Sequence, residues 1–208
     1  STLFPYTTLF RSEADSIAKV IVEIPKNIVR HIIVCDNGSI DNTSFLALEA
    51  GASVVHQPKK GYGHACLKGI EFVSGLDQKP DIIVFLDGDY SDYPEDIPQL
   101  VQPILEYNHD MVIGSRALGK MESGAMMPQQ IFGNWLATTL IKKIYKYHFT
   151  DLGPFRAIKY DQLVCMEMDD KTFGWTVEMQ VKAAKMKLIT SEIDRKSTRL
   201  NSSHLVIS

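Results

Sequence analysis

The amino-acid sequence predicts an α/β domain in which helices flank a mainly parallel β-sheet. Short apolar runs rich in β-branched residues alternate along the chain with segments whose apolar residues recur at helical spacing, which is the rhythm of βαβ units. The run over residues 82–86 is apolar throughout and stops at Asp87-Gly88-Asp89. Such a run, bounded by turn residues, is typical of a strand buried on both faces of a parallel sheet. The two carboxylates are therefore expected at the carboxyl end of this strand.

The composition sets the broad class of the protein. The chain has 208 residues, of which 45% are hydrophobic and 23% charged, enough for one domain with a sizeable core. No stretch approaches the roughly 18 apolar residues of a membrane-spanning helix. The cysteines Cys35, Cys66 and Cys165 are widely spaced, which indicates buried thiols in a reducing compartment rather than a disulfide framework. A net charge of −3 argues against nucleic acid as a partner.

Both ends of the chain are interpreted as non-native. Residues 1–12 and 194–208 read largely as the translations of a pair of widely used sequencing adapters. We therefore leave them out of the fold prediction, as one would a cloning scar, and expect one natural domain over 13–193, truncated at both ends. The first strand of the sheet would then be missing. The β-prone residues 7–10 are expected to occupy its place by chance.

A helix and a strand are expected at the start of the natural domain. Apolar residues recur at helical spacing over 13–24, and Pro25 ends this helix. The β-branched run over 28–35 then predicts a strand, and the polar residues 36–43 follow its carboxyl end.

A second helix and a second strand complete the first βαβ unit. Asp41 or Thr43 can cap the helix expected over 44–50, and Gly51 ends that helix. Residues 53–55 predict the next short strand. Strand, helix and strand at this spacing favour parallel pairing.

The basic turn Lys59-Lys60-Gly61-Tyr62-Gly63-His64 leads into a helix through 67–73. Glycines at a helix amino terminus can offer unpaired N–H groups and the positive end of the helix dipole to a phosphate. The turn lacks the third glycine of a dinucleotide fingerprint and the Gly-Lys-Ser/Thr of a phosphate loop. A plain surface loop is therefore an equally good interpretation.

The second half of the chain continues the alternation of strands and helices. The expected elements after the acidic strand are a loop over 90–98, a helix through 97–105, a strand over 111–116, a mobile loop over 117–128, a long helix over 130–149, a turn and short strand over 150–158, and helices over 160–166 and 176–187. No repeats or low-complexity linkers interrupt them, so a single domain is predicted.

The long helix over 130–149 is basic and amphipathic. One face carries the apolar residues, and the lysines lie opposite it. The apolar residues are Ile131, Trp135, Leu136, Thr139, Leu140, Ile144 and Tyr145, and the lysines are Lys142, Lys143 and Lys146. Such a helix can lie on a membrane surface, although packing against its own sheet is the commoner explanation.

Charged residues follow four of the predicted strands. Asp36, Lys60, the pair Asp87 and Asp89, and Arg116 should all meet at the carboxyl edge of the sheet, where ligands of α/β sheets bind. Residues two apart on an extended segment point to the same side, so the acidic pair can hold one hard cation. Acids for a cation and bases for anions together indicate a metal-bound phosphate ester. For an isolated acidic pair, capping of a strand end is an equally good interpretation.

Several motifs resemble those of the family 2 inverting glycosyltransferases. The run 36–43 resembles their nucleotide-binding motif, and Asp87-Gly88-Asp89 followed by residues 93–98 resembles their metal motif and its trailing loop. The order of the remaining motifs is similar to that of dolichyl-phosphate mannose synthases and related polyprenyl-phosphate sugar transferases. These motifs are Lys60-Gly61-Tyr62-Gly63, Gly114-Ser115-Arg116, Asp151-Leu152-Gly153-Pro154-Phe155-Arg156 and Trp175-Thr176-Val177-Glu178-Met179.

The resemblance implies a nucleotide-sugar transferase domain of the GT-A type and assigns roles to particular residues. Asp87 and Asp89 would be catalytic, and Asp87, Asp89 and Ser91 would hold Mg²⁺ or Mn²⁺. Asp151 is predicted as a catalytic residue on chemical grounds alone, because a carboxylate can act as a base. Ser91 stands where many relatives have a longer glutamine, and Glu13 is the last residue of the first-strand motif. Arg116 and Arg156 would bind the acceptor phosphate. The donor would be bound by Glu13, Asp36, Asn37, Lys60, Gly61, Gly63, Asp87 and Gly88.

The implied reaction is transfer of a sugar, with inversion, from a donor of the UDP-glucose or GDP-mannose type to a polyprenyl or dolichyl phosphate. The full-length protein would then lie at the cytoplasmic face of a membrane, peripheral or anchored. An acceptor phosphate is already an anion near neutral pH, so it needs positioning rather than a strong base. A sugar hydroxyl acceptor would instead need Asp151 or Glu178 as a base. Turn capping by Asp151 and a solvated helix face at Glu178 are equally good interpretations.

Two rival functions remain open from the sequence. A haloacid-dehalogenase-type phosphatase would use Asp87 as nucleophile and Asp89 as general acid, in a pattern that Asp87-Gly88-Asp89-Tyr90-Ser91 fits. That pattern normally begins its domain, however, whereas two strand–helix units precede it here. The second rival is a nucleotide-binding module without activity, or an inactive fragment.

Overall fold

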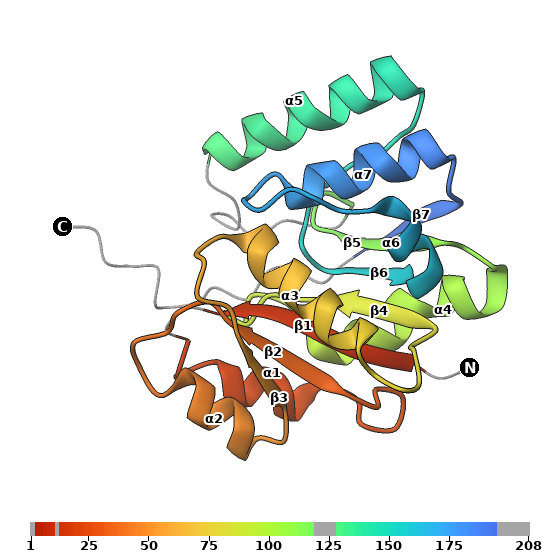
Figure 1. The fold of residues 1–208 in the computed structure, drawn as a ribbon. Coiled ribbons are helices and arrows are strands. Elements are labelled where there is room, and N and C mark those ends of the chain that lie inside the picture. The colour runs from red at the N-terminus through yellow and green to blue at the C-terminus, as the bar shows by residue number, and fades with distance from the viewer. Residues whose placement is uncertain (1–2, 11–12, 119–127, 195–208) are drawn as a thin grey trace.

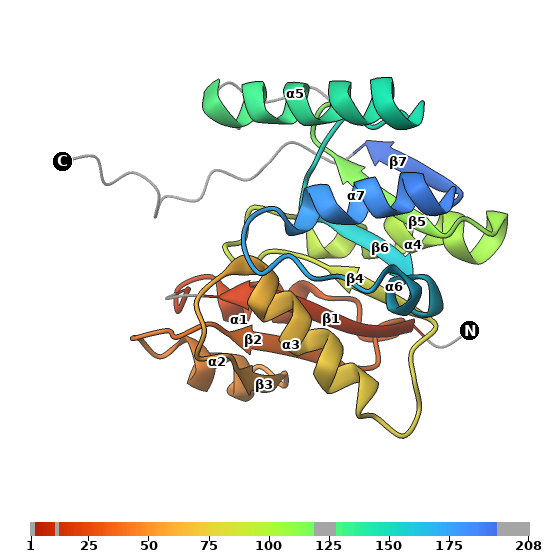
Figure 2. The same cartoon turned by 45° about the horizontal axis from the view of Figure 1, so that its top comes forward.

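The computed structural model describes residues 3–10, 13–118 and 128–194. These residues form one seven-stranded sheet with the strand order β3-β2-β1-β4-β6-β5-β7, with helices on both faces (Figures 1 and 2). The strands are β1 (Leu3–Phe10), β2 (Ile32–Asp36), β3 (Ser53–His56), β4 (Ile82–Phe85), β5 (Met111–Ser115), β6 (Arg156–Lys159) and β7 (Thr190–Asp194). The helices are α1 (Ile17–Glu23), α2 (Thr43–Glu49), α3 (Tyr62–Ser74), η1 (Pro94–Asp96, a 3₁₀ turn), α4 (Ile97–Tyr107), α5 (Pro128–Tyr145), α6 (Tyr160–Met166) and α7 (Trp175–Met186).

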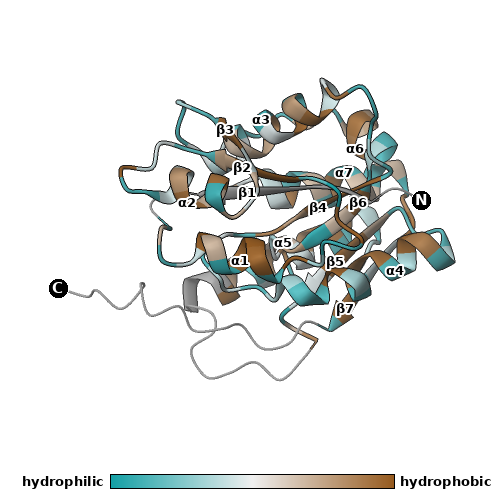
Figure 3. Ribbon diagram, turned by 90° about the horizontal axis from the view of Figure 1, so that it is seen from below, coloured by the Kyte–Doolittle hydropathy of each residue, from teal (hydrophilic) through white to brown (hydrophobic). Residues whose placement is uncertain are grey.

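Alternate residues of the strands feed two hydrophobic cores, one on each face of the sheet. In β4, Ile82 and Val84 pack into the core under α1 and α4, while Ile83 and Phe85 pack into the core under α3, α6 and α7. This arrangement explains why the strand is apolar at every position, as predicted. Figure 3 shows hydrophobic residues concentrated on the strands and on parts of α1 and α4.

The strand directions bring the predicted site residues to one edge. β1 pairs in parallel with β2 and β4, and β2 pairs in parallel with β3. β6 runs antiparallel to both β4 and β5, so β5 has the same direction as β4 although the two are not adjacent. The predicted, mainly parallel sheet is therefore confirmed, with β6 as its antiparallel strand. The carboxyl ends of β1, β2, β3, β4 and β5 lie at the same edge.

Residues 7–10 take the vacant first-strand position, as predicted. Their backbone belongs to β1, in which Thr8 lies opposite Val34 of β2 and Thr7 opposite Phe85 of β4. Without this strand, the backbone N–H and C=O groups of β2 and β4 would be buried without partners, which is costly. At the other end, β7 extends to Asp194, one residue into the segment interpreted as non-native.

Some boundaries differ from the prediction. β2 begins at Ile32 rather than 28, because residues 25–29 form a turn in which Val29 N–H donates to Pro25 O. α5 ends at Tyr145. Most of the predicted mobile loop, residues 119–127, lies outside the described residues.

The long helix α5 does not bury its predicted apolar face. Trp135 is 57% and Ile144 66% exposed, whereas Ile141 is buried on the other side of the helix. α5 contacts the body of the molecule chiefly through α7 and stands at its margin (Figures 1 and 2). The expected packing of this face on the sheet is therefore wrong. Within the described residues, no helix combines the length and the apolar character needed to cross a membrane.

The central position of β1 can be tested with a proline. Thr8→Pro removes a backbone N–H from a strand paired on both sides and leaves a buried partner unsatisfied, so we expect a loss of about 1–3 kcal/mol or more in the free energy of unfolding. The measurement is urea denaturation, with Thr8→Ala as the control because it keeps the N–H group. Equal stability of the two variants would show that residues 3–10 do not pair in the sheet.

Candidate functional site

A cavity of about 600 Å³ opens at the carboxyl edge of the sheet. Its described lining comes from the ends of β2 and β4, the start of α3, the segment before α1 and the loop before α7. The lining residues are Glu13, Asn37, Lys60, Gly61, Tyr62, Asp87, Gly88, Asp89, Thr172 and Phe173. The structure thus brings together most of the residues that the sequence assigned to donor binding.

The acidic motif forms a tight turn directly after β4. Asp89 Oδ1 accepts a hydrogen bond from Ser91 N–H at 2.9 Å, and Tyr90 takes a left-handed conformation with φ of 62°. On the other side of the turn, Asp87 N–H donates to Oδ2 of the buried Asp92 at 3.3 Å. Ser16 Oγ also donates to Gly88 O at 2.9 Å, which ties α1 to the turn. These contacts fix the backbone that carries both cavity-lining carboxylates.

The donor set of this turn fits a hard divalent cation that is shared with a substrate. Asp87 and Asp89 both reach the cavity, and carboxylate oxygens are the ligands that Mg²⁺ and Mn²⁺ prefer. Among the described residues, no group of three or more His, Cys, Asp or Glu side chains could hold a metal ion. Mg²⁺ is commonly bound by one or two carboxylates together with substrate phosphates and water, so two are sufficient. Ser91 contributes through its N–H, and metal ligation by its hydroxyl stays a prediction.

Asp36 organises the loop after β2. Its Oδ1 accepts Ser39 N–H and its Oδ2 accepts Ser44 Oγ–H, both at 2.8 Å. Burial raises the pKa of Asp36, but these hydrogen bonds outweigh it and hold the pKa below its ordinary value. The carboxylate therefore stays ionised and fixes the start of α2. Its predicted part in donor binding, which the resemblance implies as a contact with the base or ribose, stays a prediction.

Asn37 joins that loop to the glycine-containing turn. Its Nδ2 donates to Gln57 O at 3.0 Å and Lys59 O at 2.7 Å, and its Oδ1 accepts Gly61 N–H at 2.8 Å. Lys60 is exposed on this turn and lines the cavity, where its ammonium can meet an anion.

The glycine-containing turn is not the phosphate cradle that the sequence allowed. Gly63 N–H donates to Thr172 O at 3.0 Å and His64 N–H donates to Lys171 O at 3.2 Å. The N–H groups that were expected to bind phosphate are therefore occupied by the loop before α7. Glycine is needed because another backbone approaches closely, but that backbone belongs to the protein itself.

Glu13 begins the helical turn before α1 and lines the cavity. Its N–H donates to Thr43 Oγ1 at 2.8 Å, which connects the segment before α1 to the start of α2. The structure thus places Glu13 beside the acidic turn, as expected for a donor-site residue.

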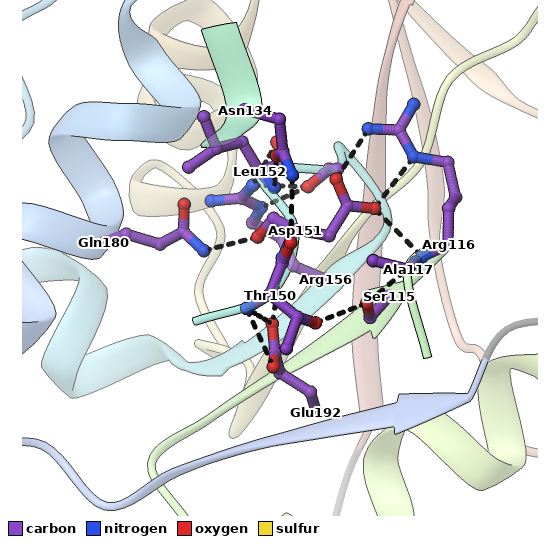
Figure 4. Close-up of polar contacts among 11 residues, drawn as sticks. Ser115, Arg116, Ala117, Asn134, Thr150, Asp151, Leu152, Arg156, Gln180 and Glu192 are labelled. Carbon is purple, nitrogen blue, oxygen red and sulfur yellow. Dashed lines mark hydrogen bonds and ion pairs between the residues drawn. The ribbon is translucent and has the colours of Figure 1, made fainter. Parts of the chain in front are cut away.

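Arg116 and Asp151 form a bidentate ion pair beside this region (Figure 4). Arg116 Nε donates to Asp151 Oδ2 and Nη2 to Oδ1, each at 2.8 Å, and the backbone N–H of Arg116 also donates to Oδ2 at 2.9 Å. Burial lowers the pKa of Arg116, but Asp151 and, at longer range, Asp92 and Asp87 raise it above its ordinary value. Arg116 is therefore a fixed cation within electrostatic reach of the acidic turn, and its Nη1 takes no part in the pair.

The predicted role of Asp151 as a catalytic base is wrong in this structure. The residue has no exposed surface. Burial raises the pKa of its carboxyl, but the hydrogen bonds and charge of Arg116 lower it further, to below its ordinary value. A buried carboxylate with a depressed pKa neither reaches a substrate proton nor holds it. Asp151 instead orients Arg116.

Arg156 does not face an acceptor either, so its predicted role in phosphate binding is contradicted. The side chain is fully buried and donates to three backbone carbonyls, those of Leu152, Gly153 and Thr176. Burial is also the main reason that its pKa is lowered. The sequence could not distinguish this inward orientation from an outward one, because Arg156 is the first residue of a strand.

Glu178, the other carboxylate considered as a base, holds a loop. Its Oε1 and Oε2 accept the N–H groups of Asp169 at 3.0 Å and Asp170 at 2.8 Å, and Lys182 lies 2.7 Å from Oε1. Burial raises the pKa of Glu178, but the contact with Lys182 and the two N–H groups lower it below its ordinary value. Glu178 is therefore neither available as a base nor part of a fully solvated helix face.

Three residues that line the cavity were not predicted from the sequence to belong to the site. Tyr62 belongs to a motif that was quoted, but no role was given to it. Thr172 and Phe173 come from a loop more than eighty residues after the acidic motif, and nothing in their local sequence indicates where that loop lies.

Comparisons with known proteins point to glycosyltransferases. The family model described as "Glycosyl transferase family 2" matches residues 11–165. Glycosyltransferase AglJ of Haloferax volcanii is 32% identical, over 88% of this chain and 58% of that protein. An undecaprenyl-phosphate mannosyltransferase of Micrococcus luteus is 28% identical, over 74% of this chain and 66% of that protein. The chain spans about three fifths of the length of the first curated relatives that it matches.

A solved structure shares the fold. Glucosyl-3-phosphoglycerate synthase of Mycobacterium tuberculosis, crystallised with Mn²⁺, UDP and phosphoglyceric acid, superposes with a TM-score of 0.77 at 19% identity, over 97% of this chain and 71% of that one. The family model covers well over half of this chain. The chain therefore belongs to glycosyl transferase family 2 and has a GT-A type fold.

Proposed function

We propose that this domain transfers a sugar, with inversion, from a metal-bound nucleotide sugar to a polyprenyl phosphate. The observation that carries the proposal is that a cavity lined by Asp87 and Asp89 lies within electrostatic reach of Arg116, an arginine held in place by a buried carboxylate. A cation site with an anion site within its electrostatic reach suits a reaction between a nucleoside diphosphate sugar and a second phosphate.

The acidic turn would hold the donor. Asp87 and Asp89 would ligate Mg²⁺ or Mn²⁺, and the cation would neutralise the charge that develops on the leaving nucleoside diphosphate. Lys60 would add a second positive charge at the cavity wall. The rigid backbone of the turn matters because ligands that are already in position lose little entropy when the donor binds.

Arg116 would bind the acceptor phosphate. Its Nε and Nη2 are occupied by Asp151, so the guanidinium cannot swing away, and Nη1 remains to meet an anion. A phosphate monoester has a second pKa of about 6 and is ionised near neutral pH, so its oxygen can attack without a strong base.

The structure favours a phosphate acceptor over a sugar hydroxyl. A hydroxyl must lose a proton to a base within hydrogen-bond reach. The two carboxylates considered for that role, Asp151 and Glu178, are committed to Arg116 and to the loop before α7. Membership of a glycosyl transferase family also removes the support for a phosphatase.

A membrane surface would present such an acceptor, and α5 offers a face for it. The exposed apolar side chains include Phe132 and Trp135, whose rings pack with centroids 5.9 Å apart. Lys142 and Lys143 lie in the last turn of the same helix and would meet anionic headgroups. The domain would then act as a peripheral membrane protein at the cytoplasmic face. The lipid-linked acceptor of the Micrococcus luteus relative, as its name states it, is consistent with this role.

The metal site can be tested by removing one carboxylate. We expect Asp89→Ala to lower turnover about 100-fold or more, because the cation contributes several kcal/mol to stabilising the leaving group. The assay measures transfer of labelled sugar from UDP-glucose or GDP-mannose to a short polyprenyl phosphate, with Mn²⁺ or a chelator. Asp77→Ala, an exposed carboxylate after α3, is the control. Near-normal turnover in Asp89→Ala would refute the assignment.

The role of Arg116 needs a variant that avoids an unpaired buried charge. Arg116→Gln alone should destabilise the fold by about 3–5 kcal/mol, because it leaves Asp151 without its partner. The double variant Arg116→Gln, Asp151→Asn should recover most of that loss and still raise the KM for polyprenyl phosphate about tenfold or more, while the KM for the donor is unchanged. An unchanged acceptor KM in the double variant would rule out Arg116 as the acceptor site.

The ion pair also predicts a dependence of stability on pH. The pKa of Asp151 in the folded protein lies below its ordinary value of 3.8. The stabilisation is therefore fully present above that pH and is lost as the pH falls below it, through the folded-state pKa. Comparing urea denaturation of the parent and the double variant from pH 6 to pH 3 measures this effect. We expect the parent to lose stability relative to the double variant on acidification, and a constant difference between them would contradict the assignment.

The membrane face can be tested with vesicles. We expect the double variant Trp135→Ser, Leu140→Ser to weaken binding to vesicles containing an anionic lipid about tenfold or more. It removes two exposed apolar side chains that would be buried in the membrane. Co-sedimentation measures the binding. Phe45→Ser is the matched control, because Phe45 is an equally exposed aromatic residue on α2. Equal binding of all three proteins would exclude α5 as the contact.

A further inference from the structure

One wall of the cavity is formed by a loop that has no role in the proposed sugar transfer. Residues 167–174 connect α6 to α7, and two of them, Thr172 and Phe173, line the cavity. Phe173 is 83% exposed and lines the cavity. An aromatic face in such a position is available to a ligand.

The loop is held by contacts on both of its sides. Toward α3, the carbonyls of Lys171 and Thr172 accept the N–H groups of His64 and Gly63. Toward α7, Glu178 accepts the N–H groups of Asp169 and Asp170. After Phe173, Gly174 O accepts the N–H group of Glu178 at 2.8 Å. The backbone on either side of Phe173 is therefore held by hydrogen bonds, so its ring is presented from a rigid support.

The glycines of the turn before α3 fit this loop closely. A Cβ atom built on Gly61 would lie 2.2 Å from Lys171 O, and one on Gly63 would lie 1.9 Å from Asp170 O. Neither position can accept a side chain unless the loop moves away. Within the loop, Asp170 Oδ1 also accepts Thr172 N–H at 2.7 Å. The glycines and the loop therefore act together to set the position of Phe173.

The neighbours of this loop indicate which part of a donor it meets. The loop docks on the turn that carries Lys60 and Gly61, and Asn37 binds that turn from the end of β2. This side of the cavity belongs to the β2 and α3 half of the molecule. Arg116, the proposed acceptor site, lies outside the described lining. A donor whose diphosphate is held at the acidic turn, with its sugar directed toward Arg116, would extend its nucleoside toward Asn37, Gly61 and Phe173.

We propose that Phe173 is the stacking platform for the nucleobase of the donor, and that Glu178 is the residue that positions it. This inference rests on the proposed function, because it assumes a nucleoside diphosphate in the cavity. A base has a flat π-face that an exposed phenyl ring can cover, and stacking tolerates either uracil or guanine. Stacking of one base on an aromatic side chain changes affinity by roughly 5- to 150-fold.

The test measures binding by isothermal titration calorimetry rather than activity. The ligands are UDP, GDP and inorganic pyrophosphate, each with Mg²⁺, because pyrophosphate keeps the metal-binding group and lacks the base. Phe173→Ala should weaken binding of UDP or GDP about 5- to 150-fold and leave pyrophosphate unchanged. Phe173→Trp should retain nucleotide binding. Phe45→Ala, an exposed phenylalanine on α2 outside the cavity, is the control and should bind all three ligands like the parent.

A second pair of variants tests the positioning role. Glu178→Ala frees the two loop N–H groups and should weaken UDP or GDP binding, again without affecting pyrophosphate. Glu178→Gln keeps a carbonyl oxygen that can accept one of the N–H groups and should restore part of the affinity. A purely structural role would lower thermal stability in both variants without separating the nucleotide from pyrophosphate.

The outcomes separate this inference from the proposed function. If the parent binds UDP or GDP and Phe173→Ala binds equally well, the stacking role is overturned while the proposed function stands. An equal loss of nucleotide and pyrophosphate binding would also overturn it, because the effect would then not involve the base. If the parent binds neither nucleotide, both the inference and the proposed function fail.

Discussion

The pairing of β4 at the centre of the sheet is the constraint on which the site depends. β4 is hydrogen-bonded in parallel to β1 and antiparallel to β6, and both of its faces are buried. This strand cannot shift by one residue without exchanging Ile83 and Val84 between the two cores. Its end is therefore fixed, and so is the turn that directs Asp87 and Asp89 into the cavity. The other site residues take their positions relative to that turn, because β2 and β5 end at the same edge.

Four charged residues around this edge build the site and do not line the cavity. Asp36 fixes the start of α2, Asp151 orients Arg116, Glu178 holds the loop before α7, and Arg156 satisfies three carbonyls. Burial explains this division of labour, because a charge removed from water must be paired or hydrogen-bonded. The charged side chains that line the cavity, among them Lys60, are only partly covered or exposed. They are the residues to which binding and catalysis are assigned in the proposed function.

The apolar face of α5 shows how far hydrophobic periodicity can be interpreted. The spacing of its apolar residues predicts a helix correctly, but it does not determine what covers the apolar face. The side of α5 toward the body carries Asn134 and the buried Ile141. The side-chain amide of Asn134 donates a hydrogen bond to Thr150 O and accepts one from Leu152 N–H. A surface helix usually turns its apolar side to the core and its polar side to solvent. In α5 a hydrogen-bonded polar residue faces the body and most of the apolar side chains face outward. The proposed membrane contact of α5 follows from that reversal.

The sequence by itself determined the succession of strands and helices, and it placed the acidic pair at the carboxyl edge of the sheet as the centre of the candidate site, because these follow from local periodicity and from the geometry of parallel strands. It also predicted that residues 7–10 would complete the sheet, because of their β propensity, and in the structure they pair with both β2 and β4. Only the tertiary structure decided which polar residues face the cavity. The orientation of Arg156, the pairing of Asp151 with Arg116 and the docking of the loop before α7 on Gly61 each depend on contacts between segments distant in the sequence or on burial. Local sequence carries no record of such contacts, since the same residue types suit a buried structural role and an exposed functional one.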